Sequence, residues 1–150
     1  MKISQGLRQF IAGKGLLVTT GLYEAVFYLA AGGVVEKVHY FHVPKPHYSD
    51  REDFTLGGGA LIFESGAKFE SIRLWRQHNF LRQFKEDLLV YSKQLKIVEI
   101  YLFIPRAVVK KIITTLPQPI RPRVKAVYVG NWHRQHPFVL LKKIRPPFSV

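Results

Sequence analysis

Basic side chains provide most of the candidate chemistry in this 150-residue chain, and they form two groups. The first lies on a predicted helix and comprises Lys68, Arg73, Arg76, Arg82 and Lys85. We favour the first three of these, because they lie nearest to a preceding glycine-rich segment. The second group has no acidic residue within it and comprises Lys110, Lys111, Arg121, Arg123 and Lys125. Ammonium and guanidinium groups bind phosphate through charge-assisted hydrogen bonds, so both groups are candidate RNA-binding residues. For the first group, the alternative interpretation is a helix face that only contacts solvent.

The charge of the chain is polarised along the sequence. The formal net charge is +13, and residues 106–150 carry ten basic and no acidic side chains, whereas residues 1–67 carry six of each. Each contact between a basic side chain and a phosphate releases condensed counterions, which makes such a surface a good partner for a polyanion. The distribution therefore favours nucleic acid or the ribosome over an anionic membrane, and over charge that only aids solubility.

Known arrangements for nucleophilic catalysis are missing from the sequence. The chain has no cysteine, which also excludes disulfides and thiolate metal sites, and no serine in a Gly-x-Ser-x-Gly context. Gly57, Gly58 and Gly59 form neither a P-loop nor a dinucleotide fingerprint, and we interpret them as part of an exposed loop. Glu64 could act as a carboxylate base, but RNA would repel its charge. We assign no catalytic residue from these patterns.

The histidines do not indicate a metal site. His39 and His42 point to opposite faces of a predicted strand, because side chains alternate along a strand. His133 and His136 could meet on one helical turn, but they lack a carboxylate partner in the acid-free C-terminal segment. His78 borders a predicted apolar stripe, and we interpret it as a hydrogen-bonded structural residue. We therefore predict no metal and no cofactor.

Length and composition predict one globular domain without a membrane segment. A chain of 150 residues with 47% hydrophobic content can bury a single core. No uninterrupted apolar run approaches the roughly 20 residues of a membrane-spanning helix, and residues 1–12 lack the apolar core of a signal peptide. We therefore expect a soluble, cytoplasmic protein with no membrane partner.

Periodicity and turn residues predict an α/β fold of the mixed α+β kind, with three packed helices on a mixed sheet. An N-terminal meander of three strands is expected at 16–20, 25–30 and 34–43, after an arm at 1–14 whose residues 4–12 are amphipathic. An exposed loop is expected at 45–59 and a C-terminal tail at 145–150. The remaining elements are helix 68–94, strand 97–104, helix 106–116, strand 124–129 and helix 137–144. On the long helix, Leu74, Leu81 and Leu88 are the expected buried stripe.

The segment ESGAKFESIRLWRQHNFLRQF, at 64–84, carries a resemblance to a known family. It resembles the middle domain of the archaeal and eukaryotic class-1 peptide-chain release factors and of their relative Pelota. In that family a Gly-Gly-Gln loop leads into a long basic helix with an Arg-His-Asn-aromatic step. The corresponding residues here are Gln77, His78, Asn79 and Phe80, and Ser65, Phe69 and Arg73 also fall on like residues. The predicted element order extends the resemblance over about 15–144.

The loop of that family is not kept. In an ungapped alignment Glu64 takes the place of the family's Gln, and if Gly57, Gly58 and Gly59 stand in for the loop, Ala60 takes that place. No glutamine lies between Gln9 and Gln77 to restore it. In the family this Gln holds water beside the ester of peptidyl-tRNA, so the departure puts hydrolysis in doubt.

Three functional hypotheses follow. The first is a ribosome- or tRNA-binding domain, related to release and ribosome-rescue factors, that does not hydrolyse the peptidyl-tRNA ester. For this hypothesis, the resemblance implies that the N-terminal end of the predicted helix 68–94 approaches the tRNA acceptor stem. A divergent peptidyl-tRNA hydrolase is the second. The third is a protein-interaction module whose basic region meets an acidic partner. Whether the chain is an enzyme stays open in the sequence.

Overall fold

The computed structural model describes residues 1–45 and 65–144, with side chains described for 1–45 and 70–144. Its elements are β1 (Gly15–Thr20), β2 (Glu24–Ala31), β3 (Val34–His42), α3 (Ser65–Gln94), β4 (Glu99–Ile104), α4 (Arg106–Thr115), the 3-10 helix η1 (Arg121–Arg123), β5 (Val124–Val129) and α5 (Pro137–Lys143). Every predicted helix and every strand named above occurs, with ends that differ by no more than three residues. Beyond Lys45, the predicted 45–59 loop with Gly57, Gly58 and Gly59 lies outside the described residues, as do Glu64 and the 145–150 tail.

The strands form one mixed sheet in the order β3-β2-β1-β4-β5. The first three pair antiparallel as a meander, whereas β4 lies parallel to both β1 and β5. Parallel neighbours need a long crossover connection, and α3 and α4 lie in the two crossovers that reach β4 and β5. The predicted α/β fold, with a mixed sheet, an N-terminal meander and three helices, is confirmed for the described part of the chain.

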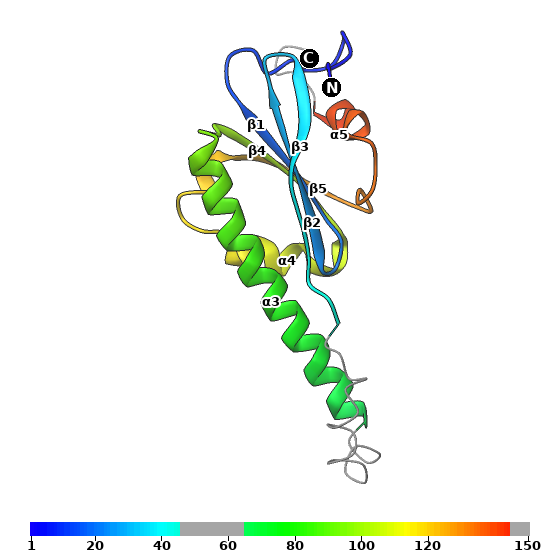
Figure 1. Ribbon diagram of the computed structural model, residues 1–150. Coiled ribbons are helices and arrows are strands. Elements are labelled where there is room, and N and C mark those ends of the chain that lie inside the picture. Colours follow the sequence, from blue (N-terminus) through cyan, green and yellow to red (C-terminus); the bar gives the residue numbers. More distant parts are fainter. Residues whose placement is uncertain (46–64, 145–150) are drawn as a thin grey trace.

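Helices lie on both faces of the sheet (Figure 1). On one face α3 and α4 pack over a core that includes Phe27 and Ile112. On the other face α5 and the N-terminal arm pack over a second core that includes Phe103 and Leu140. Because β4 is covered on both sides, its residues from Ile100 to Ile104 are all buried, which explains its nearly continuous apolar sequence. Within the described residues, no helix has both the length and the apolar character to cross a bilayer.

α3 is longer than the sheet that it covers. Its 30 residues span about 45 Å, whereas strands of six to nine residues span about 20 to 30 Å. The N-terminal turns of α3 therefore project beyond the strands (Figure 1). The predicted stripe is wrong for this reason: Leu88 is fully buried, but Leu81 is only partly buried and Leu74 is 50% exposed. The fully buried apolar side chains among the described residues of this helix are instead Phe80, Phe84 and Leu88.

A β-bulge changes which side chains of β3 face the core. The register shifts so that Phe27 pairs with His39 and Tyr28 with Lys37, which leaves Val38 as an extra residue. Simple alternation predicted that Val38 and His39 face opposite sides. That prediction is wrong, because the bulge turns Val38 toward the core under α3, where it is partly buried.

The N-terminal arm forms no helix and packs against the sheet. Lys2 bridges to Val34 in antiparallel fashion, which places the arm beside the start of β3. Ile3 and Phe10 are buried in the second core, whereas Ile11 is 75% exposed.

An ion pair fixes the arm to β4. Arg8 Nη2 lies 2.6 Å from Glu99 Oε2, and Arg8 Nη1 donates a hydrogen bond to the Tyr101 hydroxyl at 2.8 Å. Tyr101 donates in turn to Glu99 Oε1 at 2.5 Å. Burial, together with this hydrogen bond, holds the pKa of Tyr101 well above its ordinary value. Arg8 is therefore a structural residue of the arm.

Candidate nucleic-acid interface

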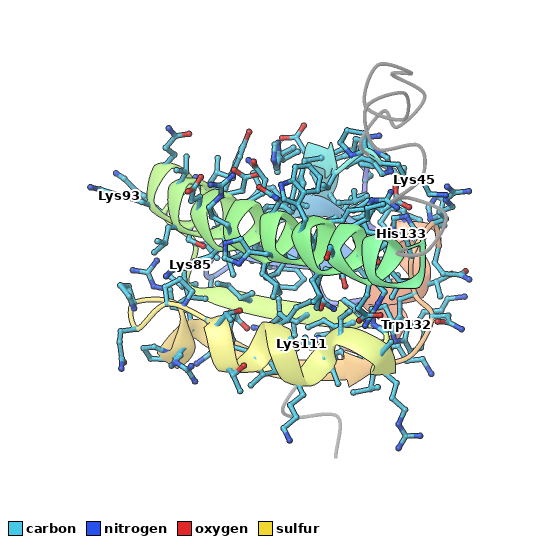
Figure 2. All side chains as sticks on the ribbon, turned by 90° about the horizontal axis from the view of Figure 1, so that it is seen from below. Lys45, Lys85, Lys93, Lys111, Trp132 and His133 are labelled. Atoms are coloured by element: carbon cyan, nitrogen blue, oxygen red, sulfur yellow. The ribbon has the colours of Figure 1, made fainter. Side chains whose placement is uncertain are left out.

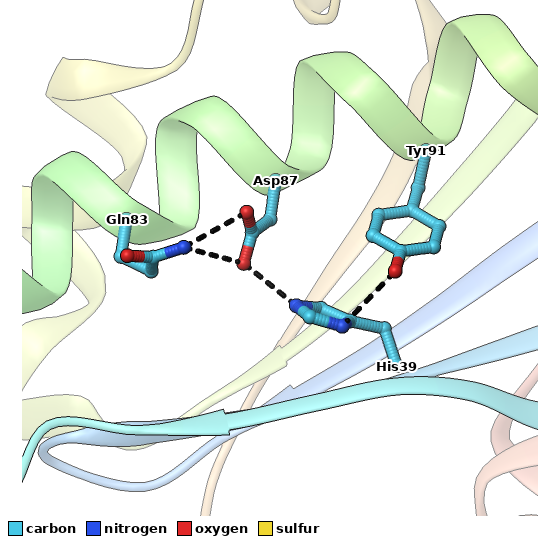
Figure 3. Close-up of polar contacts among 4 residues, drawn as sticks. All are labelled: His39, Gln83, Asp87 and Tyr91. Carbon is cyan, nitrogen blue, oxygen red and sulfur yellow. Dashed lines mark hydrogen bonds and ion pairs between the residues drawn. The ribbon is translucent and has the colours of Figure 1, made fainter.

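A polar network fixes the side of α3 that faces β3 (Figure 3). His39 Nε2 lies 2.7 Å from Asp87 Oδ2, and the Tyr91 hydroxyl lies 3.2 Å from His39 Nδ1. The His39 and Tyr91 rings stack with centroids 4.6 Å apart, and Gln83 donates to both Asp87 oxygens at 3.0 and 3.1 Å. These contacts join β3 to residues 48 and 52 positions later in the chain, and so they set the rotation of α3 about its axis.

The opposite flank of α3 lies beside α4, and a hollow of about 530 Å³ opens between them. α3 and the end of α4 with its following turn line this α3–α4 groove, through His78, Leu81, Arg82, Lys85, Thr114, Thr115, Leu116, Pro117 and Gln118. Lys111 Nζ donates to Gln77 Oε1 at 2.6 Å and so bridges the two helices. Figure 2 shows α3 and α4 running side by side, with Lys85 on the first and Lys111 on the second.

The α3–α4 groove is positively charged. Arg82 and Lys85 bring two cations to it, and none of its described lining residues is acidic. Asp87 of α3 is turned to the other flank, where His39 binds it. A phosphate in contact with the described lining would therefore meet cations and no carboxylate, while the exposed Glu86 follows Lys85 on α3 outside that lining.

The structure gives Arg73 and Arg76 partners within the protein. Arg73 is exposed and pairs with Glu70 one turn earlier in α3. Arg76 Nε donates to the carbonyl oxygen of Val43 at 2.8 Å, and its guanidinium lies 4.0 Å from the centroid of the Tyr23 ring. Arg76 thus fastens α3 to the end of β3, and this structural role was not predicted.

The second predicted group is divided by the fold. Lys110 is exposed on α4, while Lys111 bridges to α3. Arg121 donates from Nε to the Leu116 carbonyl at 3.1 Å and from Nη2 to the Thr114 carbonyl at 3.2 Å. Because the last carbonyls of a helix lack partners within it, Arg121 acts as a cap for α4.

The last two members of that group lie in separate hollows. Arg123 lines a hollow at the C-terminal end of α3 together with Lys93 and Lys96. Lys125 lines another with Lys143 of α5, on the opposite face of the sheet. The predicted RNA-binding residues therefore do not form one patch. Lys68 lies within α3, and its side chain is outside the described part.

His78 is exposed in the α3–α4 groove and forms no hydrogen bond with the described residues, so its predicted role as a hydrogen-bonded structural histidine is wrong. His39 has that role instead, in the network with Asp87. His136 Nδ1 accepts a hydrogen bond from the Phe138 backbone N–H at 3.1 Å and caps α5. In the described ranges, no three histidine, aspartate or glutamate side chains come together as a possible metal site.

A second polar cluster ties the loop after β5 to the turn between β1 and β2. Glu24 Oε1 lies 2.6 Å from His133 Nε2 and 3.8 Å from Arg134 Nη2, and the Tyr40 hydroxyl donates to Glu24 Oε2 at 2.9 Å. Burial alone would raise the pKa of Glu24. The hydrogen bond from Tyr40 and the charges of His133 and Arg134 outweigh burial, so the pKa lies below its ordinary value.

Arg82 and Lys85 are the groove residues that sequence reasoning did not favour. Preference went to basic residues nearest to the glycine-rich segment, whereas the groove lies further along α3. Their spacing from His78, at four and seven residues, places all three on one flank of a helix. That spacing is a usable signal, but only the structure shows which flank meets α4.

The fold was compared with known proteins. No protein-family model matches the chain, and no curated protein matches it. Among solved structures, the archaeal translation termination factor aRF1 is similar, with a TM-score of 0.52 and 10% sequence identity. The match covers 78% of this chain and 30% of the factor, so the chain corresponds to less than a third of that protein. At this identity the likeness is one of fold, and it agrees with the resemblance seen in the sequence.

Proposed function

We propose that this chain is a ribosome- or tRNA-binding domain, related to factors of translation release and ribosome rescue, that acts without hydrolysing the peptidyl-tRNA ester. The α3–α4 groove carries the proposal. Arg82 and Lys85 line this hollow between α3 and α4, and its described lining has no acidic residue. Lys110 is exposed on α4. The fold likeness to a translation termination factor supports the same assignment.

The groove suits a phosphate backbone better than a base. Its lining contains cations and the Gln118 amide, whose N–H groups can donate hydrogen bonds to phosphate oxygens, while the hydroxyls of Thr114 and Thr115 donate to backbone carbonyls of α4. No aromatic side chain other than the His78 imidazole belongs to the described lining, so a stacking platform for bases is not formed there. Binding is therefore expected to follow the shape and charge of the RNA more than its sequence.

Arg76 and Arg121 are left out of the proposed contact set, because their guanidinium groups already fasten α3 and cap α4. We place Arg82 and Lys85 at its centre, and Lys110, which is exposed on α4, beside them in the contact set. Lys68, Arg73 and Lys111 extend it along the two helices. Lack of hydrolysis is inferred from the sequence, since no glutamine lies between Gln9 and Gln77 to hold the attacking water.

The test is binding to purified ribosomes and to deacylated tRNA over a range of salt concentrations. The variant R82E/K85E/K110E reverses two charges that line the groove and one on the exposed surface of α4. Three lost phosphate contacts should lower the slope of log K against log salt by about 2 to 3, and weaken binding at low salt by at least about tenfold.

The matched control is K2E/K37E/K142E, which makes the same change in net charge at exposed positions on the arm, β3 and α5. It should keep a wild-type slope. Equal losses of RNA affinity in the two variants would refute an RNA-binding surface at the groove. Absence of binding by the wild-type chain at low salt would refute it as well. Circular dichroism of both variants checks that each is folded.

A further inference from the structure

A second hollow lies at the C-terminal end of α3, next to the α3–α4 groove: Leu89 follows Lys85 of the groove by one helical turn, and Pro119 directly follows Gln118. It has a volume of about 580 Å³, within the range of ligand-binding pockets. α3 ends beside it at Gln94, and the segment between α4 and β5 closes its other side through Pro119 and Arg123. Figure 2 shows Lys93 at this end of α3, opposite to the end near Lys45. We call it the Lys93 pocket.

The floor of the Lys93 pocket is apolar. It is formed by Leu89, Ile97, Val98, Pro119 and Ile120. Val98 is 52% exposed, which leaves apolar surface open to solvent at the edge of the floor. Such surface is favourable to cover, because its removal from water contributes to binding.

A buried hydroxyl without a partner also lines this pocket. Ser92 is 1% exposed, and its Oγ has no hydrogen-bond partner among the described residues. A buried hydroxyl that lacks a hydrogen bond destabilises the protein unless another molecule supplies the partner. Ser92 therefore offers a donor or acceptor to a ligand that enters the hollow.

The rim of the pocket is cationic. Lys93, Lys96 and Arg123 surround the apolar floor, and their side-chain nitrogens form no hydrogen bond or ion pair with the described residues. No acidic side chain belongs to its described lining. Lys96 also has a φ of 55°, in the left-handed region that favours glycine. The backbone N–H groups of Lys96 and Ile97 donate to the carbonyl oxygens of Lys93 and Ser92, so this conformation closes the end of α3 and holds Lys96 at the rim.

This combination selects one kind of partner. RNA phosphates would satisfy the rim but leave the apolar floor uncovered, and the described lining has no aromatic ring on which a base could stack. A peptide with carboxylates beside a large apolar side chain satisfies both parts, with Ser92 available to its backbone. We propose that the Lys93 pocket binds a short acidic segment of a partner protein, with at least one aliphatic or aromatic side chain seated on the floor.

The pocket shares no lining residue with the adjoining α3–α4 groove, so different variants test the two proposals and each can fail without the other. The probe is a fluorescein-labelled dodecapeptide in which Asp-Glu pairs flank a central Leu-Phe, and its binding is followed by fluorescence anisotropy. Two matched peptides isolate the parts of the site. One replaces Leu-Phe by Ser-Ser, and the other replaces the acids by Asn and Gln. Both should bind at least about tenfold more weakly than the parent peptide.

Protein variants locate the contact. K93Q/K96Q should lower the affinity for the parent peptide by about tenfold. R82Q/K85Q makes the same change in charge at the α3–α4 groove and should leave that affinity within about twofold of wild type. K96G gives a second variant of the rim whose backbone is unstrained, so a loss of binding there cannot come from misfolding. Circular dichroism verifies that each variant is folded.

Three results would overturn the proposal. Equal affinity for the Ser-Ser peptide and the parent peptide would reduce the site to a charged surface. Equal losses of peptide affinity in K93Q/K96Q and R82Q/K85Q would show that binding is not located at the pocket. Displacement of the peptide by deacylated tRNA, together with weaker tRNA binding in K93Q/K96Q, would make the pocket part of the RNA face.

Discussion

Two Leu→Ala substitutions on α3 test how this helix sits on the sheet. Leu74 and Leu88 lie on the same helix and were both predicted to be buried by spacing alone, so the two changes share the same chemistry and the same change in helix propensity. In the structure Leu88 is fully buried beneath the helix, whereas Leu74 is 50% exposed. The difference between the two losses in stability therefore reports on position only.

The magnitudes follow from burial. Removal of a fully buried leucine side chain costs about 2 to 5 kcal/mol, because transfer free energy is lost and a cavity remains. For Leu88 we expect about 3 kcal/mol, since it lies within the core that includes Phe84 and Phe27. For Leu74 we expect less than about 1 kcal/mol, because half of the side chain is already in water and solvent fills the space that it leaves.

Urea unfolding followed by circular dichroism measures both values at 25 °C. The slope of the free energy against urea should stay unchanged in each variant, so that the midpoint reports stability directly. Equal losses in the free energy of unfolding at Leu74 and Leu88 would refute the position of α3, in which Leu88 faces the core and the N-terminal turns extend past the strands. A loss below about 1 kcal/mol at Leu88 would contradict the core assignment in the same way.

Three further predictions concern the Glu24 cluster, the end of α3 and the chemistry of the chain. E24Q should lower the free energy of unfolding at pH 7 by about 1 to 3 kcal/mol. The folded-state pKa of Glu24 lies below its ordinary value of 4.5, so the extra stability of the wild type is complete above pH 4.5 and is lost as pH falls through the folded-state pKa. The difference in stability between wild type and E24Q, measured by unfolding at pH 7 and at pH 3, should therefore be smaller at pH 3. K96G should not destabilise the protein and should raise stability by up to about 1 kcal/mol, since relief of the left-handed backbone outweighs the greater freedom of glycine in the unfolded chain; a measured loss in thermal unfolding would be the contrary result. The chain should release no peptide from peptidyl-tRNA above a buffer control, with or without ribosomes; release by the wild type that disappears in E64A would instead support the hydrolase hypothesis.

Local patterns in the sequence were enough to predict the elements of this fold. Strand and helix periods depend on neighbouring residues, so the meander, the long basic helix and the apolar β4 were all predicted before the structure, with small errors at their ends. The polarised charge and the missing glutamine are also properties of the sequence alone. They were sufficient to favour a polyanionic partner and to argue against ester hydrolysis.

Tertiary structure decided which side of each element faces the core and which faces solvent. The rotation of α3 is set by His39 and Asp87, which lie 48 residues apart, and a spacing pattern within the helix does not contain that information. A bulge at Val38 likewise depends on the pairing of β3 with β2. For the same reason, periodicity placed Leu74 in the core although the helix extends past the strands.

The basic residues show the same division most clearly. Their number and positions are read from the sequence, but their availability depends on contacts between elements that are distant in the chain. Arg76 and Arg121 are held by the backbone carbonyls of Val43 and Leu116, so their charge supports the fold, whereas Arg82 lines an open groove. A guanidinium group can donate to a backbone carbonyl or to a phosphate, and only the packing of the elements determines which partner lies within reach.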